Sequence, residues 1–301
     1  MDSATTLCID GLTDLGVRRL NNEDAWWIGQ VGGSSCFMEP GSAPLSLPIE
    51  SLQQPAFLIV SDGVGGANAG EVASQMAVTL ISAGLAQSAG ALVQSSSAQD
   101  AILAVLGSAN ETIKTKAAEP GFEGMGATLS LLCLASGGSA YWGQVGDSRI
   151  YLYRAGVLRQ ISRDHSPVGR LRQQGKITEE EARRHPQRNQ IDQSLGDPMN
   201  PFEPDTGVEE AQPGDVFLLC SDGLSDGLWD REIGQILAAV HQAADVRPAV
   251  QQLVGRAKTA SGRDNITAVV AFLAGPQPAA VPPAGKDASL IGRLRKIVKR
   301  E

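Results

Sequence analysis

Two apolar segments of this chain end in the same tripeptide, Ser-Asp-Gly, at Asp62 and at Asp222. The length and composition of each segment fit a buried strand, so each would deliver a carboxylate to a strand end. The glycine that follows lets the backbone turn sharply or lie close to a ligand. A third candidate, Asp264, stands just before another apolar segment. Carboxylates brought together from distant parts of a chain would bind a hard cation such as Mg²⁺ or Mn²⁺.

Each of these aspartates also has an ordinary alternative role as a turn or helix-capping residue. The repetition of the tripeptide favours convergence on one site instead. Converging carboxylates lose hydration and repel one another unless a cation or a proton neutralises them. A metal site by itself does not define a reaction, so the function has to be inferred from the wider pattern.

Composition narrows the class of protein. The 301 residues are 42% hydrophobic and carry a formal net charge of −8. Such an acidic chain is a poor match for phosphate backbones, so nucleic acid is not an expected partner. The four cysteines lack metal-ligand spacing, which fits a reducing compartment. There is no signal-peptide pattern and no apolar run of the roughly 20 residues that span a bilayer, so we expect a cytoplasmic protein.

The pattern of elements between residues 5 and 273 favours antiparallel sheets with helices packed outside them, and not a series of βαβ units. The fold class predicted is α+β. The expected strands are Thr5–Leu12, Ala25–Val31, Ala56–Ser61, Thr128–Ala135, Ser139–Val145, Arg149–Arg154, Val216–Ser221 and Ile266–Leu273. The expected helices are Ala69–Leu85, Asp100–Ala118, Asp230–Val240 and Arg247–Ala260.

Three segments are predicted to be peripheral. Residues 32–55 are rich in Gly, Ser and Pro and are expected to form a surface loop insertion. Residues 167–204 are polar and hold a short helix, in which Thr178 and Glu181 have capping-box spacing. Residues 274–301 combine a Pro/Ala linker with a basic amphipathic tail. Two interpretations of this tail are open, a weak contact with a membrane or an acidic partner and a purely solubilising segment.

Six short motifs follow one another in a specific order. They are Gly16–Asp24, Asp62–Gly66, Gly124–Thr128, Gly146–Arg149, Ser221–Asp226 and Gly262–Asn265. Any one of them is weak evidence, but the ordered set resembles the metal-dependent Ser/Thr protein phosphatases of the PPM (PP2C) family, in particular the bacterial members. The resemblance covers nearly all of residues 5–273. It implies one phosphatase domain over residues 1–273, built as a central β-sandwich of two antiparallel sheets flanked by pairs of helices.

The resemblance also implies a two-metal site for Mn²⁺ or Mg²⁺, with a third cation often present in bacterial members. By position, Asp62 would bridge both metals and Gly63 would offer its backbone carbonyl to one of them. The other ligands implied are Asp222 and Asp264 for the first metal, Glu23 and Asp24 for the second metal through bound water, and Asp147 with Asp222 for the third.

The implied reaction is hydrolysis of phosphoserine and phosphothreonine on proteins by a hydroxide that bridges the two metals. Arg19 would grip the substrate phosphate, to which its planar guanidinium is suited. Residues 167–204 correspond in position to the family's flap, where His185 and Arg188 are candidate substrate contacts. Many eukaryotic relatives carry a histidine where this chain has Val64, so the group that protonates the leaving oxygen is left open.

A protein of this kind is expected to act as a monomer on phosphorylated proteins and to oppose a bacterial-type Ser/Thr kinase. Two alternatives remain. One is a non-catalytic member that binds phosphoproteins, although every metal position of the family is present. The other is a phosphatase with the same chemistry that acts on a small phosphomonoester or on a regulatory anti-sigma-type phosphoprotein.

Overall fold

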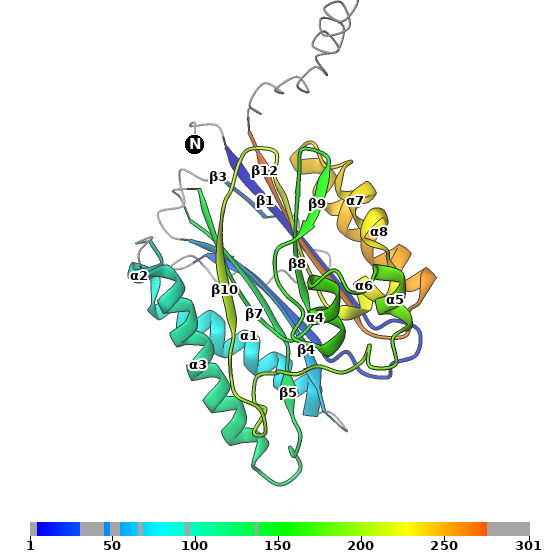
Figure 1. Cartoon of the computed structure of the whole chain (residues 1–301). Helices are drawn as coiled ribbons and strands as arrows, with labels where there is room; N and C mark the ends of the chain where they lie inside the picture. The colour runs from blue at the N-terminus through cyan, green and yellow to red at the C-terminus, as the bar shows by residue number, and fades with distance from the viewer. Residues whose placement is uncertain are drawn as a thin grey trace, which may run out of the picture.

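Two antiparallel sheets lie face to face in the computed structural model, and helices cover both outer faces (Figure 1). The structure describes residues 5–30, 45–48, 55–65, 69–93, 97–135 and 138–275. This arrangement confirms the predicted α+β sandwich. The predicted tail and most of the predicted insertion lie outside the described residues.

The first sheet has the strand order β3-β1-β12-β11-β8-β9. Strands β1 and β12, from opposite ends of the predicted phosphatase domain, pair from Thr6↔Ala274 to Asp14↔Ile266. This pairing places the loop after β1 beside the segment that precedes β12. The strands are β1 (Thr6–Asp14), β3 (Leu45–Pro48), β8 (Arg149–Arg154), β9 (Val157–Gln160), β11 (Val216–Cys220) and β12 (Ile266–Ala274).

The second sheet has the strand order β10-β7-β6-β4-β2, and the short β5 pairs with the end of β4. In the register of β2 and β4, Asp24 lies opposite Asp62. The strands are β2 (Asp24–Gln30), β4 (Ala56–Val64), β5 (Gly126–Ala127), β6 (Leu129–Leu134), β7 (Ser139–Val145) and β10 (Asp205–Glu210).

Helices α1 and α3 cover the second sheet, while α6, α7 and α8 lie on the first (Figure 1). The short helices α4 and α5 belong to the predicted flap. The helices are α1 (Ala69–Gln87), α2 (Ala89–Val93), α3 (Ala98–Ala117), α4 (Pro167–Gln173), α5 (Glu179–Arg184), α6 (Asp222–Gly227), α7 (Asp230–Leu237) and α8 (Val246–Ala260).

The central strands are buried on both faces, which is why they read as continuous apolar runs. In β4, Phe57 and Ile59 pack against the helical layer, whereas Leu58 and Val60 pack against the other sheet. Successive strand side chains point to opposite faces, so each face needs apolar residues. Three apolar layers result, one between the sheets and one under each group of helices.

The prediction for residues 32–55 was wrong in one part, because Leu45–Pro48 forms strand β3 and pairs with β1. Strands β9 and β10 and helix α4 also went unpredicted. Both strands lie at sheet edges, where only one side of the backbone is paired, and neither has a continuous run of buried apolar residues. The predicted capping box at Thr178 and Glu181 is present. Within the part of the chain that the structure describes, no helix is long and apolar enough to cross a membrane.

Candidate active site

A polar cavity of about 370 Å³ opens at one end of the sandwich, where the ends of several strands meet. The predicted ligands converge there from segments far apart in sequence. Two predicted site residues, Asp24 and His185, are not part of its lining. The predicted site residues that line the cavity are Arg19, Glu23, Asp62, Gly63, Asp147, Arg188, Asp222 and Asp264.

Asp62 and Gly63 are fixed at the end of β4 by backbone hydrogen bonds. The backbone N–H of Asp62 donates to the hydroxyl of Thr128 at 3.0 Å, and that of Gly63 donates to the carbonyl of Glu23 at 3.0 Å. Helix α1 starts so close that a Cβ on Gly63 would lie 1.9 Å from the carbonyl oxygen of Gly70. Only glycine fits between the end of β4 and the start of α1, and Gly63 also lines the cavity.

Asp24 lies below the cavity and links the two sheets. Its Oδ2 accepts hydrogen bonds from the hydroxyl of Ser221 at 2.7 Å and from that of Thr267 at 2.6 Å. Ser221 directly follows β11 and Thr267 lies in β12, so both donors come from the first sheet. Its Oδ1 is buried without a hydrogen-bond partner. Burial raises the pKa of this carboxyl to about 6. A contact of Asp24 with a metal through water therefore stays a prediction.

Asp222 and Asp147 both line the cavity and are close enough for their charges to interact. Asp222 is the first residue of α6, and its Oδ1 is also buried without a partner. Burial, followed by the charge of Asp147, holds the pKa of Asp222 well above its usual range. Burial, followed by the charge of Asp164, raises the pKa of Asp147 to about 7. For Asp62, burial and then the charges of its neighbours raise the pKa strongly as well.

Arg19 reaches the cavity from the loop between β1 and β2. Its Nη1 donates to Glu23 at 3.1 Å and its Nη2 donates to Asp264 at 2.7 Å. The hydrogen bond with Asp264 is the main cause that raises the pKa of Arg19. The Arg19 side chain is 44% exposed, so it extends from the acidic residues of the cavity towards solvent.

Asn265 fixes that loop, and sequence reasoning gave it no role. Its side chain donates to the carbonyls of Leu15 at 3.0 Å and Asn21 at 3.1 Å, and it accepts from the backbone N–H of Glu23 at 2.8 Å. Asn265 is itself almost completely buried. Only its place in a motif beside Asp264 could have drawn attention to it.

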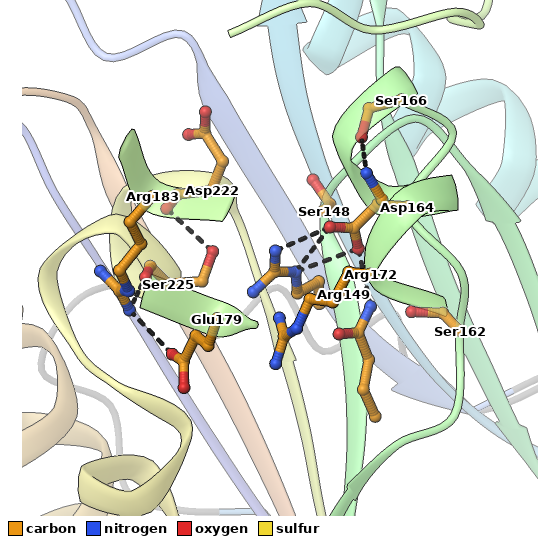
Figure 2. Close-up of polar contacts among 12 residues, drawn as sticks. Ser148, Arg149, Ser162, Asp164, Ser166, Arg172, Glu179, Arg183, Asp222 and Ser225 are labelled. Carbon is orange, nitrogen blue, oxygen red and sulfur yellow. Dashed lines mark hydrogen bonds and ion pairs between the residues drawn. The ribbon is translucent and has the colours of Figure 1, made fainter. Parts of the chain in front are cut away.

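The flap holds the helix that starts at Asp222. From α5, Arg183 donates to the carbonyl of Ser225 at 2.6 Å (Figure 2). It also donates to the carbonyls of Asp226, at 2.9 Å, and of Leu228. These carbonyls lie at the C-terminal end of α6, where a helix has no internal donors left. The same guanidinium stacks 4.3 Å from the ring centre of Trp229.

A second, smaller cavity of about 60 Å³ lies under the flap and adjoins the first. Arg149 forms a wall of it through a double hydrogen bond with Asp164, from Nε at 3.0 Å and from Nη2 at 2.7 Å (Figure 2). Arg188 lines both cavities. His185 ends α5, and its Nδ1 accepts from the backbone N–H of Gln187 at 3.2 Å. The substrate role predicted for His185 gains no support from this position and stays a prediction.

Comparison with known proteins identifies the family. A family model described as Protein phosphatase 2C matches residues 47–268. Protein phosphatase PhpP from Streptococcus pneumoniae is 33% identical over 258 residues, which cover 85% of this chain and 93% of the relative. This chain belongs to the protein phosphatase 2C family.

Solved structures of the phosphatase 2C family share the fold. The Streptococcus agalactiae serine/threonine phosphatase superimposes with a TM-score of 0.72 and 32% identity, and the match covers 88% of this chain and 99% of that one. The catalytic domain of the phosphatase PstP, solved in complex with two manganese ions, gives a TM-score of 0.69 and 32% identity over 90% of this chain and all of that one. By family, this chain is a metal-dependent serine/threonine protein phosphatase of the bacterial type.

The donors in the cavity fit the divalent cations on which the phosphatase 2C family depends. Asp222 has a buried oxygen without a partner, and the carboxyls around it have raised pKa values. Among the residues that the structure describes, no three His, Cys, Asp or Glu side chains form a closed ligand set around one ion. Each cation would therefore be bound by few protein oxygens and would keep several water ligands, as Mg²⁺ usually does in proteins.

Metal binding should depend on pH in a defined direction. Folding raises these carboxyl pKa values from about 3.9 in an unfolded chain, to about 6 for Asp24 and about 7 for Asp147. Between about pH 4 and pH 7 the metal-free folded protein holds more protons than the unfolded chain, so its free energy of unfolding falls as pH rises. Mn²⁺ needs ionised ligands, so its stabilising effect should grow over the same range.

Differential scanning fluorimetry with and without Mn²⁺ measures this effect without using activity. The Mn²⁺-induced rise in Tm should be larger at about pH 7.5 than at about pH 5. Asp222→Asn should reduce the rise at the higher pH, while Asp100→Asn on the exposed side of α3 should not. Equal rises at the two pH values would contradict the site as described.

Asn265→Ala should impair catalysis by releasing the loop that carries Arg19. The change deletes three hydrogen bonds and should lower kcat/KM for p-nitrophenyl phosphate by about 10- to 100-fold, the range typical of groups that orient metal ligands. The control is Asn200→Ala, because Asn200 lies in an exposed turn and bonds only locally to Asp197. A folded Asn265→Ala protein with wild-type kcat/KM would show that the loop needs no such support.

Proposed function

We propose that this phosphatase hydrolyses phosphoserine and phosphothreonine on proteins with two bound cations, Mn²⁺ or Mg²⁺, in the cavity at the end of the sandwich. The observation that carries the proposal is the meeting of Asp62, Asp222 and Arg19 in one cavity. Acidic groups that suit a cation and a basic group that suits a phosphate thus share one space. Phosphoryl transfer needs both, because charge builds up on the phosphoryl oxygens.

Each cavity residue has a proposed task. Asp62 would hold both cations, and Gly63, which lines the same cavity, would add its backbone carbonyl oxygen. When bound, the two cations would supply the attacking hydroxide, since divalent cations lower the pKa of bound water. The other proposed ligands are Asp222 and Asp264 for one cation, Glu23 and Asp24 for the other through water, and Asp147 with Asp222 for a third.

Arg19 is proposed to hold the substrate phosphate. It is anchored by Glu23 and Asp264, and its exposed guanidinium can turn its remaining N–H groups towards a dianion at the mouth. Arg188 of the flap lines the same cavity and adds a second positive charge. Val64, which also lines the cavity, carries no proton to donate, so it serves only as an apolar wall.

In the cell, the substrates would be proteins phosphorylated by a Ser/Thr kinase, whose action this phosphatase would reverse. We further propose that residues 1–273 act as one catalytic domain, as a monomer and in the cytoplasm. The nine-residue pairing of β1 with β12 supports the domain assignment, because it joins the two ends of this segment into one sheet.

Hydrolysis of p-nitrophenyl phosphate and of a phosphothreonine peptide tests the proposal. The wild type should turn over both with Mn²⁺ and neither with excess EDTA. Asp222→Asn should lower kcat by about 100-fold or more, because the change removes a charged ligand from a preorganised site. Asp100→Asn, at an exposed position on α3, should behave as wild type. Turnover in EDTA, or full activity in Asp222→Asn, would refute the proposed mechanism.

A further inference from the structure

The loop between β1 and β2, which carries Arg19 of the cavity lining, also exposes three aliphatic side chains. Leu15 is 39% exposed, Val17 is 64% exposed and Leu20 is 95% exposed. Over the described residues, seven large apolar side chains are this exposed, and three of them lie within this one short loop. We call these three residues the apolar rim. Single exposed apolar residues are common, but a cluster of them at one place marks a surface that binds something.

The apolar rim is held in a fixed conformation and not on a freely moving loop. Asn265 binds the carbonyls of Leu15 and Asn21, and the backbone N–H of Val17 donates to the carbonyl of Gly262 at 2.8 Å. Asn22 also donates to the hydroxyl of Thr13 at 2.8 Å. A surface that is already ordered loses little entropy when a partner binds to it.

The apolar rim lies on the same loop as a residue of the catalytic cavity. Arg19, the proposed phosphate-binding residue, stands between Val17 and Leu20 in sequence and lines the cavity. Arg263 lines the cavity next to the rim, and Arg18 is exposed on the same loop. A partner that binds here would therefore place a negatively charged group near these arginines and an apolar group on the rim.

We propose that the apolar rim binds an aliphatic side chain of the substrate protein, one or two residues from its phosphoserine or phosphothreonine. This inference rests on the proposed function and adds a substrate class to it, namely phosphorylated segments with a flanking Leu, Ile or Val. Consecutive residues of an extended chain lie about 3.3 to 3.6 Å apart, so a neighbour of the phosphoresidue reaches the residues that adjoin Arg19. A phosphate in the cavity and an aliphatic group on the rim fit one extended segment.

Two matched sets of phosphothreonine peptides test this inference. Peptides of the first set carry a single Leu at one position between two residues before and two residues after the phosphothreonine. Peptides of the second set carry a single Ser at the same positions. The wild type should prefer the Leu peptide at one or more positions by about fivefold in kcat/KM, as expected when part of a leucine side chain leaves water. Leu20→Ser and Val17→Ser should each reduce the preference. p-Nitrophenyl phosphate, which is too small to reach the rim, should be hydrolysed as by wild type.

Val157→Ser is the matched control, because Val157 is also 64% exposed but begins the edge strand β9, at the opposite side of the first sheet from β1 and β3. This variant should keep the full preference for Leu peptides. Equal kcat/KM for the Leu and Ser peptides at every position, or an unchanged preference in Leu20→Ser, would overturn the inference. If the wild type does not hydrolyse p-nitrophenyl phosphate, this result would instead refute the proposed function. In that case, fluorescence anisotropy with the same labelled peptides still measures whether the rim favours Leu.

Discussion

Repulsion among buried carboxylates is the constraint around which this structure is arranged. Burial is the main cause that raises the pKa values of Asp24, Asp62, Asp147 and Asp222, and neighbouring aspartates raise several of them further. Hydrogen bonds from the chain satisfy only some of their oxygens, since Oδ1 of Asp24 and of Asp222 have none. Burying such a cluster costs free energy that packing elsewhere must offset. Divalent cations remove that cost, so metal binding and folding are energetically linked.

The sandwich meets this constraint by attaching the acidic cluster to both sheets at once. Asp24 lies opposite Asp62 in the second sheet. Its carboxylate nevertheless accepts hydrogen bonds from two residues of the first sheet, Ser221 at the end of β11 and Thr267 in β12. A single carboxylate thereby fixes the spacing of the two sheets directly below the cavity. Removal of Asp24 would therefore alter the position of Asp62 as well as the local charge.

The sequence reveals those parts of the fold that obey a strong local pattern. Central strands such as β4 have apolar residues on both faces, and their limits were predicted to within a few residues. Edge strands such as β9 and β10 pair on one side only and have no run of buried apolar residues, so their sequences resemble those of loops. The position of Asp24 below the cavity, and the role of Asn265, depend on contacts between segments more than 190 residues apart. No local pattern encodes contacts of that kind.

The flap is more than a cover over the substrate, because it helps to position a proposed metal ligand. Helix α6 has six residues, too few to be stable alone, and begins at Asp222. Arg183 binds the carbonyls at the other end of α6, and its guanidinium is held in turn by Glu179 at 3.2 Å and by Trp229. A shift of α5 would move these anchors and, through α6, the carboxylate of Asp222. Sequence changes in the flap can thus shift the carboxylate of Asp222, a proposed metal ligand, through α6.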